Sequence, residues 1–170
     1  MTQEVRRIRP DEAPKLRALR LSALADAPMA FGSTLSREAA FPEHVWQERA
    51  EGGASGADRA TFIAERDGEW IGLATGLATD PDAPNDTRPV LVGMFVAPSW
   101  RERGVGAALV NAVVAWARER RAIGLCLWVT ATNSPVIALY HKCGFRRTGE
   151  HKPLAHFPSL TEFRMIRDLR

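Results

Sequence analysis

Two glycines and two arginines lie in a short turn between an apolar run and a helical pattern, in FVAPSWRERGVGAALV, residues 95–110. A helix that begins after such a turn presents free backbone N–H groups at the positive end of its dipole, which favours an anion. Gly104 and Gly106 keep side chains away from that backbone, and Arg101 and Arg103 could add charge-assisted hydrogen bonds. The stretch therefore predicts a phosphate-binding turn.

A purely structural interpretation of the turn stays open. The glycines could serve only the turn and the close packing of the helix on a sheet, with the arginines solvated, and for a glycine pair by itself this interpretation is the stronger one. Two other phosphate motifs are excluded, because the sequence has no GxxxxGK[ST] and because GxGxxG would need a glycine where Leu109 stands.

A second segment, NSPVIALYHKCGF (133–145), follows one predicted helix and one predicted strand later. RERGVGA (101–107) matches R/Q-x-x-G-x-G/A, and the second segment matches N-x-x-x-(A)-x-x-L-Y-x-x-x-G-F, so the ordered pair resembles the GNAT-type N-acetyltransferases over nearly the full chain. The resemblance implies the GNAT acyl-CoA N-acyltransferase fold, an α/β fold with a mixed, mostly antiparallel sheet that splays after its fourth strand and is flanked by helices. It also implies acetyl-CoA as the acetyl donor.

The resemblance assigns the cofactor site residue by residue. Backbone groups of the strand that ends at Val96 would pair with the pantetheine arm, and the turn 101–107 would hold the pyrophosphate, chiefly through backbone N–H groups. Asn133 would contact the cofactor arm. The predicted cofactor-binding residues are Met94, Phe95, Val96, Arg101, Glu102, Arg103, Gly104, Val105, Gly106, Ala107 and Asn133.

Tyr140, the one tyrosine of the chain, is the predicted catalytic residue. In the implied reaction an amine loses a proton, attacks the thioester carbonyl and expels a thiolate, helped by in-line placement and by a strand N–H near Met94 that could stabilise the oxyanion. A phenol with a pKa of about 10 can protonate the thiolate. Tyr140 could instead be a packing residue with its hydroxyl at the surface.

The general base is not evident. In the ribosomal-protein-modifying branch of the superfamily an acid stands in the strand before the Asn segment, whereas this chain has Trp128, which argues against ribosomal N-terminal acetylation. The strand 90–96 also has no carboxylate. Glu38, Glu43, His44 or water could supply the base, although each of these side chains could equally be a solvated surface residue.

Three segments should surround the acceptor by the resemblance: residues 29–47 as a wall, with 79–88 and 152–160 near its mouth. We predict direct attack by a primary amine of a small polar molecule in a ternary complex. The alternatives are an acetyltransferase for a protein or peptide amine, a non-catalytic CoA-binding or regulatory module, and a nucleotide-binding domain. Acids that could attract a cationic amine, or be solvated loop charges, are Asp80, Asp82, Asp86, Glu38 and Glu43.

The elements that must position these residues alternate between strands and helices. The helix at 104–121 should bury Val105, Leu109, Ala112, Val113 and Trp116. Asp67-Gly68 predicts a hairpin turn within 60–78, and Pro42 a break or kink in a helix over 37–50. Further predictions are strands at 4–9, 90–98, 125–131, 145–152 and 161–169, helices at 10–28 and 133–144, and loops at 29–36, 51–58, 79–89 and 153–159.

Composition limits the class of protein. The chain of 170 residues fits one domain, 1–170, with 45% apolar and 25% charged residues, and it has neither a secretory signal nor a tract long enough to span a bilayer. Its net charge of +3 comes from interspersed acids and bases, which argues against nucleic acid. Cys126 and Cys143 form neither a disulfide framework nor a metal-ligand set. We expect a cytoplasmic monomer or homodimer with no metal and no membrane partner.

Overall fold

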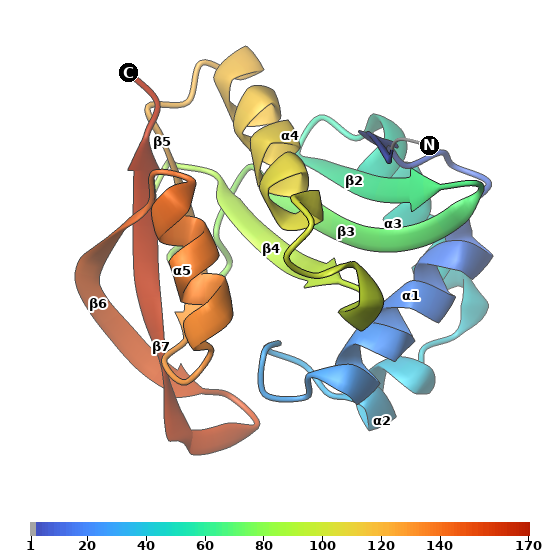
Figure 1. The fold of residues 1–170 in the computed structure, drawn as a ribbon, viewed down its shortest axis with the longest axis horizontal. Coiled ribbons are helices and arrows are strands. Elements are labelled where there is room, and N and C mark those ends of the chain that lie inside the picture. Colours follow the sequence, from blue (N-terminus) through green and yellow to red (C-terminus); the bar gives the residue numbers. More distant parts are fainter. Residues whose placement is uncertain (1–2) are drawn as a thin grey trace.

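One seven-stranded sheet carries helices on both faces (Figure 1) in the computed structural model, which describes residues 3–170. The strand order is β1-β2-β3-β4-β5-β7-β6. The strands are β1 (Glu4–Arg7), β2 (Arg59–Arg66), β3 (Glu69–Leu77), β4 (Val90–Val96), β5 (Gly124–Thr130), β6 (Arg146–Leu154) and β7 (Phe157–Asp168). The helices are α1 (Ala13–Asp26), α2 (Leu35–Ala39), α3 (Glu43–Ser55), α4 (Val105–Glu119) and α5 (Ser134–Lys142), and a 3₁₀ turn covers Pro98–Trp100.

The sheet opens between β4 and β5, the one parallel pair among the described strands. Their register has two pairs, Val90 with Cys126 and Leu91 with Leu127, and beyond Leu91 the strands diverge (Figure 1). All other neighbours are antiparallel. This confirms the predicted mixed, mostly antiparallel sheet that splays after its fourth strand.

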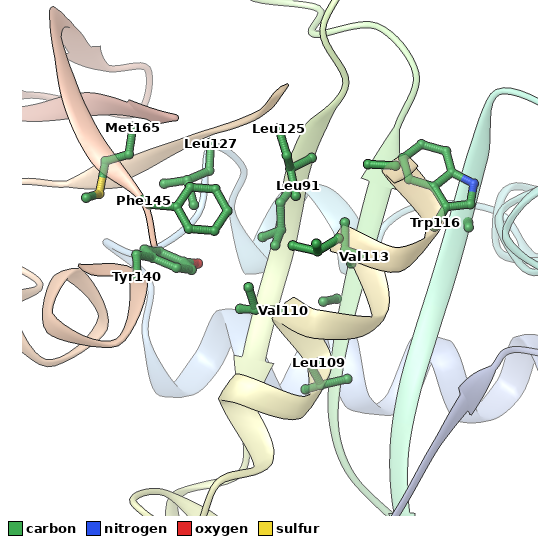
Figure 2. Packing of buried hydrophobic residues seen from close by; sticks show 14 of the residues in the cluster. Leu91, Leu109, Val110, Val113, Trp116, Leu125, Leu127, Tyr140, Phe145 and Met165 are labelled. Carbon is green, nitrogen blue, oxygen red and sulfur yellow. The ribbon is translucent and has the colours of Figure 1, made fainter. Parts of the chain in front are cut away.

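Two apolar clusters cover the two faces of the sheet. Helices α4 and α5 pack on one face, where Figure 2 shows Leu109, Val113 and Trp116 of α4 directed at the strands. Helices α1 and α3 cover the other face with Leu24, Trp46 and neighbouring residues. The buried stripe of α4 is wider than predicted, because Val110, Val114 and Ala117 are also buried, whereas Ala112 is only half-buried.

The structure confirms two features that were predicted from glycine and proline residues. Asp67 and Gly68 both have positive φ, 53° and 80°, as a two-residue hairpin between β2 and β3 requires. The helix predicted over 37–50 is interrupted near Pro42: α2 ends at Ala39, and Pro42 stands immediately before the first residue of α3.

Two predicted loops are mostly regular structure, so those predictions were wrong. Residues 51–55 of the loop predicted at 51–58 are the last turn of α3. Gly53 is buried there, and its lack of a side chain lets the helix lie close to Thr61 of β2. In the loop predicted at 153–159 the strands β6 and β7 run on until only Ala155 and His156 separate them, because pairing across the hairpin outweighs the two prolines.

Gly53→Ala should destabilise the protein although alanine favours helices more than glycine does. A Cβ on Gly53 would lie 2.6 Å from Thr61 Oγ1 and 2.8 Å from Thr61 Cβ, and relieving such overpacking costs about 1–3 kcal/mol. Gly52→Ala is the matched control, since the nearest atoms to its Cβ would belong to the flexible side chain of Arg59. Urea unfolding of both variants tests this, and equal stabilities would contradict the packing role of Gly53.

Candidate active site

A bulge interrupts β4 where the strands begin to diverge. The register pairs Leu73 with Phe95 and Thr75 with Val92, so Gly93 and Met94 together stand opposite the single residue Ala74. Gly93 has φ +65°, a backbone conformation that suits glycine. A bulge leaves one residue without a ladder partner, and here it falls at the predicted oxyanion position near Met94.

Beyond the bulge, no strand of the described residues pairs with the edge of β4 that faces β5. The Ala97 N–H donates to the Ile71 carbonyl at 2.8 Å, so the preceding pair, Gly72 and Val96, does not exchange ladder hydrogen bonds. The backbone groups of Val96 therefore point away from β3, toward the side from which β5 has diverged. Phe95 is buried, so this segment offers a ligand mainly its backbone.

The turn before α4 leaves backbone N–H groups free at the start of the helix, as the predicted phosphate-binding turn would require. Glu102 and Gly104 have positive φ, 60° and 83°, and Gly104 caps the helix. The first intrahelical hydrogen bond runs from the Ala108 N–H to the Gly104 carbonyl. The N–H groups of Val105, Gly106 and Ala107 precede this bond at the positive end of the helix dipole.

The two arginines of the turn have protein partners. Arg101 Nη2 lies 2.6 Å from Asp26 Oδ2, and Arg101 Nε donates to the Val96 carbonyl at 2.9 Å. The guanidinium of Arg103 lies over the ring of Trp100, 5.2 Å from its centroid. Arg101 is thus not the free phosphate ligand that its side chain suggested, because a carboxylate from α1 already binds it.

Gly106 has the packing role that the structural interpretation of the turn proposed. A Cβ there would lie 2.8 Å from Leu139 Cδ2 of α5 and 3.2 Å from Met94 Cε. The missing side chain thus lets α4 approach α5 and β4. This role and an exposed backbone N–H are compatible, since the side-chain direction and the N–H direction differ.

Tyr140 is not at the surface: it is 4% exposed and belongs to the cluster under α4 and α5. Its ring lies 5.8 Å from that of Phe145, and in Figure 2 its hydroxyl points from α5 toward Val110 of α4. Burial raises the pKa of Tyr140 well above its usual range, so the phenol keeps its proton at neutral pH. Within residues 3–170, no protein group hydrogen-bonds the hydroxyl.

Asn133 lies at the N-cap of α5, after β5 ends. Its backbone N–H donates to the Thr130 carbonyl at 2.9 Å. The described residues give its side chain no capping hydrogen bond to α5, so the amide is not committed to the helix end.

Four of the five acids predicted to attract an amine are already paired. Asp82 binds Lys152 at 2.5 Å, and Asp86 binds both Arg88 and Arg164. Asp80 is 1% exposed, and it accepts a hydrogen bond from Trp128 Nε1 at 2.9 Å. Asp80 and Asp86 are therefore neither solvated loop charges nor free attractors, whereas Asp82 is paired but stays exposed. The Asp80 bond ties Trp128 of β5 to the loop that precedes β4.

Glu38, the fourth of these acids, is buried between two arginines. Its carboxylate binds Arg20 at 2.9 Å and Arg49 at 2.9 Å. Burial alone would raise the pKa of Glu38, but the two arginines outweigh burial and lower the pKa to about 2. Glu38 is a poor general base because its lone pairs are taken and its pKa is low. It holds Arg20, whose Nη1 lies 3.9 Å from the position of a Cβ on Gly93, beside the bulge.

Sequence reasoning missed Glu162 of β7, a nearly buried carboxylate opposite the end of β5. Burial raises its pKa, and Lys152 Nζ lies 3.4 Å from Glu162 Oε2. The period-two pattern of the strand 161–169 could have placed Glu162 and Arg164 on one face. It could not have shown which loop covers that face.

Comparison with known proteins assigns the family. The model of the Acetyltransferase (GNAT) family matches residues 21–145, so the chain belongs to the GNAT acetyltransferase family. Streptothricin acetyltransferase of Streptomyces lavendulae is 38% identical over 112 residues, which cover 64% of this chain and 57% of that protein. Aminoglycoside N(6′)-acetyltransferase type 1 of Stenotrophomonas maltophilia is 35% identical over 96 residues, covering 54% and 63%. The chain thus spans less than two thirds of these relatives.

Solved structures share the fold at low identity. A GNAT-family acetyltransferase from Streptococcus pneumoniae has a TM-score of 0.81 at 19% identity, covering 99% of this chain and 100% of that one. The PaiA N-acetyltransferase of Thermoplasma acidophilum, in complex with coenzyme A, has a TM-score of 0.74 at 14% identity and covers 99% of both chains. Within residues 3–170 of the present chain, no helix is long and apolar enough to cross a membrane.

Proposed function

We propose that this chain transfers the acetyl group of acetyl-CoA to a primary amine of a small polar molecule by direct attack in a ternary complex. The observation that carries the proposal is the opening between β4 and β5 beyond Leu91, together with the bulge at Gly93 and Met94. An extended pantetheine arm could pair with the unpartnered edge of β4 as an added strand.

The cofactor site follows from the same elements. The N–H groups of Val105, Gly106 and Ala107 would bind the pyrophosphate, the backbone of Val96 the pantetheine arm, and Asn133 would contact that arm from α5. The N–H at the bulge would stabilise the oxyanion, and Tyr140 would protonate the sulfur. Support for coenzyme A comes from the family and from the coenzyme A complex of the Thermoplasma acidophilum protein.

A small acceptor is favoured by the two curated relatives, whose names specify streptothricin and aminoglycosides. A protein or peptide amine is the alternative. Trp128, which donates a hydrogen bond to Asp80, argues only against ribosomal N-terminal acetylation, because an acid stands at this position in the ribosomal-protein-modifying branch. In both cases the acceptor would approach from the α1 face, where Arg20 lies beside Gly93.

Thiol release from acetyl-CoA should require an amine from the small-molecule class. The test incubates the protein with acetyl-CoA and, in turn, streptothricin, aminoglycosides, polyamines, amino acids and peptides with free N-termini. Thiol release and product mass are measured, with heat-denatured protein as the control. Turnover with peptides alone would replace the small acceptor by a peptide one, and tight CoA binding without any turnover would establish the non-catalytic module.

A further inference from the structure

Glu162 lies at the level of the β4 bulge, across the opening of the sheet. The last parallel pair is Leu91 with Leu127, and Met94 and Thr130 each stand three residues further along their strands. Glu162 pairs with Thr130 in the antiparallel register of β5 and β7. Its strand position therefore matches that of the residue at which the thioester carbonyl would be held.

The face of the sheet that carries Glu162 is opposite to that of Tyr140. Directly paired residues of neighbouring strands point to the same face, and side chains alternate along each strand. Leu127, Val129 and Met165 belong to the cluster with Tyr140, so Thr130 and Glu162 point the other way.

The segment that follows α1 lies on the Glu162 face. Thr130 Oγ1 donates to the Met29 carbonyl at 2.6 Å, and His156 Nε2 lies 2.8 Å from the Pro28 carbonyl. Residues 28 and 29 thus approach both the end of β5 and the turn between β6 and β7. This is the side from which the acceptor would approach in the proposed function.

The surroundings of Glu162 suit a base rather than a structural ion pair. Within the described residues its one ion-pair partner is Lys152, which it shares with Asp82. By contrast, Glu12 accepts two and Glu38 accepts three hydrogen bonds from arginine side chains. Burial raises the pKa of Glu162 in spite of Lys152, and Asp82 raises it further, whereas His156 lowers it.

We propose that Glu162 binds the acceptor ammonium and removes its proton, as the general base of the reaction; this inference rests on the proposed function. The proton passes to the carboxylate and frees the nitrogen lone pair, which attacks the thioester carbonyl carbon. The C–N bond forms and the C–S bond breaks, and the second proton that the nitrogen must lose balances the proton gained by the sulfur. Glu162 then returns its proton to water. Glu162 as the base and Tyr140 as the acid thus act from opposite faces of the sheet.

Glu162→Gln keeps the shape of the side chain and removes its basicity. With an amine that the wild type acetylates, kcat/KM should fall about 100-fold or more, the usual scale for a lost general base. Coenzyme A affinity and melting temperature should stay close to those of the wild type. Calorimetry on the coenzyme A complex should also show weaker binding of the amine, because the ammonium loses its carboxylate.

The pH profile separates a base from a structural role. Because a base acts only when deprotonated, wild-type kcat/KM should fall as the pH drops through the raised pKa of Glu162, and Glu162→Gln should lack that acid limb. Asp82, Lys152 and His156 face this carboxylate, and histidine is the side-chain type that most often causes pH dependence near neutrality. His156→Asn is therefore the control and should keep the acid limb.

The outcomes distinguish two failures. An active wild type with an equally active Glu162→Gln variant, or an acid limb that persists in this variant, would overturn the role of Glu162 and leave the proposed function intact. A wild type that releases no thiol with any amine would overturn the proposed function, and the base with it. A melting temperature lowered by many degrees, with unchanged kcat/KM, would make Glu162 a structural residue.

Discussion

Tyr140→Phe should bind coenzyme A nearly as the wild type does, while kcat falls about 100-fold or more, the usual scale for a lost general acid. The substitution keeps the ring that packs against Phe145 and removes the hydroxyl, for which the described residues provide no hydrogen-bond partner. The substitution should therefore change the free energy of unfolding very little. If the hydroxyl protonates the sulfur, the chemical step loses its acid.

The burial of Tyr140 affects its chemistry in two ways. A raised pKa keeps the phenol protonated at neutral pH, and it also makes the phenol a weaker acid. The same apolar surroundings disfavour the departing thiolate, so the two proton affinities rise together and transfer stays feasible.

Kinetics under defined conditions test the role of Tyr140. The rate must be measured at saturating cofactor with chemistry shown to be rate-limiting, because slow product release would hide the effect. Tyr140→Leu, which removes the ring, should lower the melting temperature and so measures the packing contribution separately. Wild-type kcat in the Phe variant under these conditions would remove Tyr140 from the mechanism.

Ala107→Glu should raise the Kd for coenzyme A about 10- to 100-fold relative to Ala107→Gln. Ala107 is the third residue of α4, beside the N–H groups that would hold the pyrophosphate. A carboxylate there repels the phosphates, and charges a few ångströms apart near a protein surface interact by a few kcal/mol. The same carboxylate suits the positive end of a helix, so the unliganded protein should keep its stability.

The Gln variant has nearly the same size, so the difference between the two variants isolates the charge. Calorimetry with coenzyme A should show the deficit shrinking as salt increases, because salt screens exposed charges. Acetyl-pantetheine lacks the pyrophosphate and should bind both variants equally. Equal coenzyme A affinities of the Glu and Gln variants would show that the phosphates lie elsewhere.

The sequence by itself determined the features that depend on neighbours along the chain. The hairpin at Asp67-Gly68, the break at Pro42 and the glycine cap of α4 each follow from the backbone preferences of one or two residues. The apolar spacing of residues 104–121 predicts a helix, since side chains three and four positions apart share a face. The ordered pair of motifs around Gly104 and Tyr140 identified the family for the same reason: each motif is a local segment.

Only the tertiary structure decided which groups are available for chemistry. Arg101 is paired with Asp26, which is 75 residues away in sequence, and Glu38 is enclosed by Arg20 and Arg49 from two other helices. The bulge at Gly93 arises from the pairing of β4 with β3, a strand from another part of the sequence. Glu162 is nearly buried because β5, β6 and the loops over them meet around β7. Charge pairing and burial depend on segments far apart in the chain. Residue type and spacing could therefore name candidate acids, but they could not distinguish a carboxylate held by arginines from one that can accept a proton.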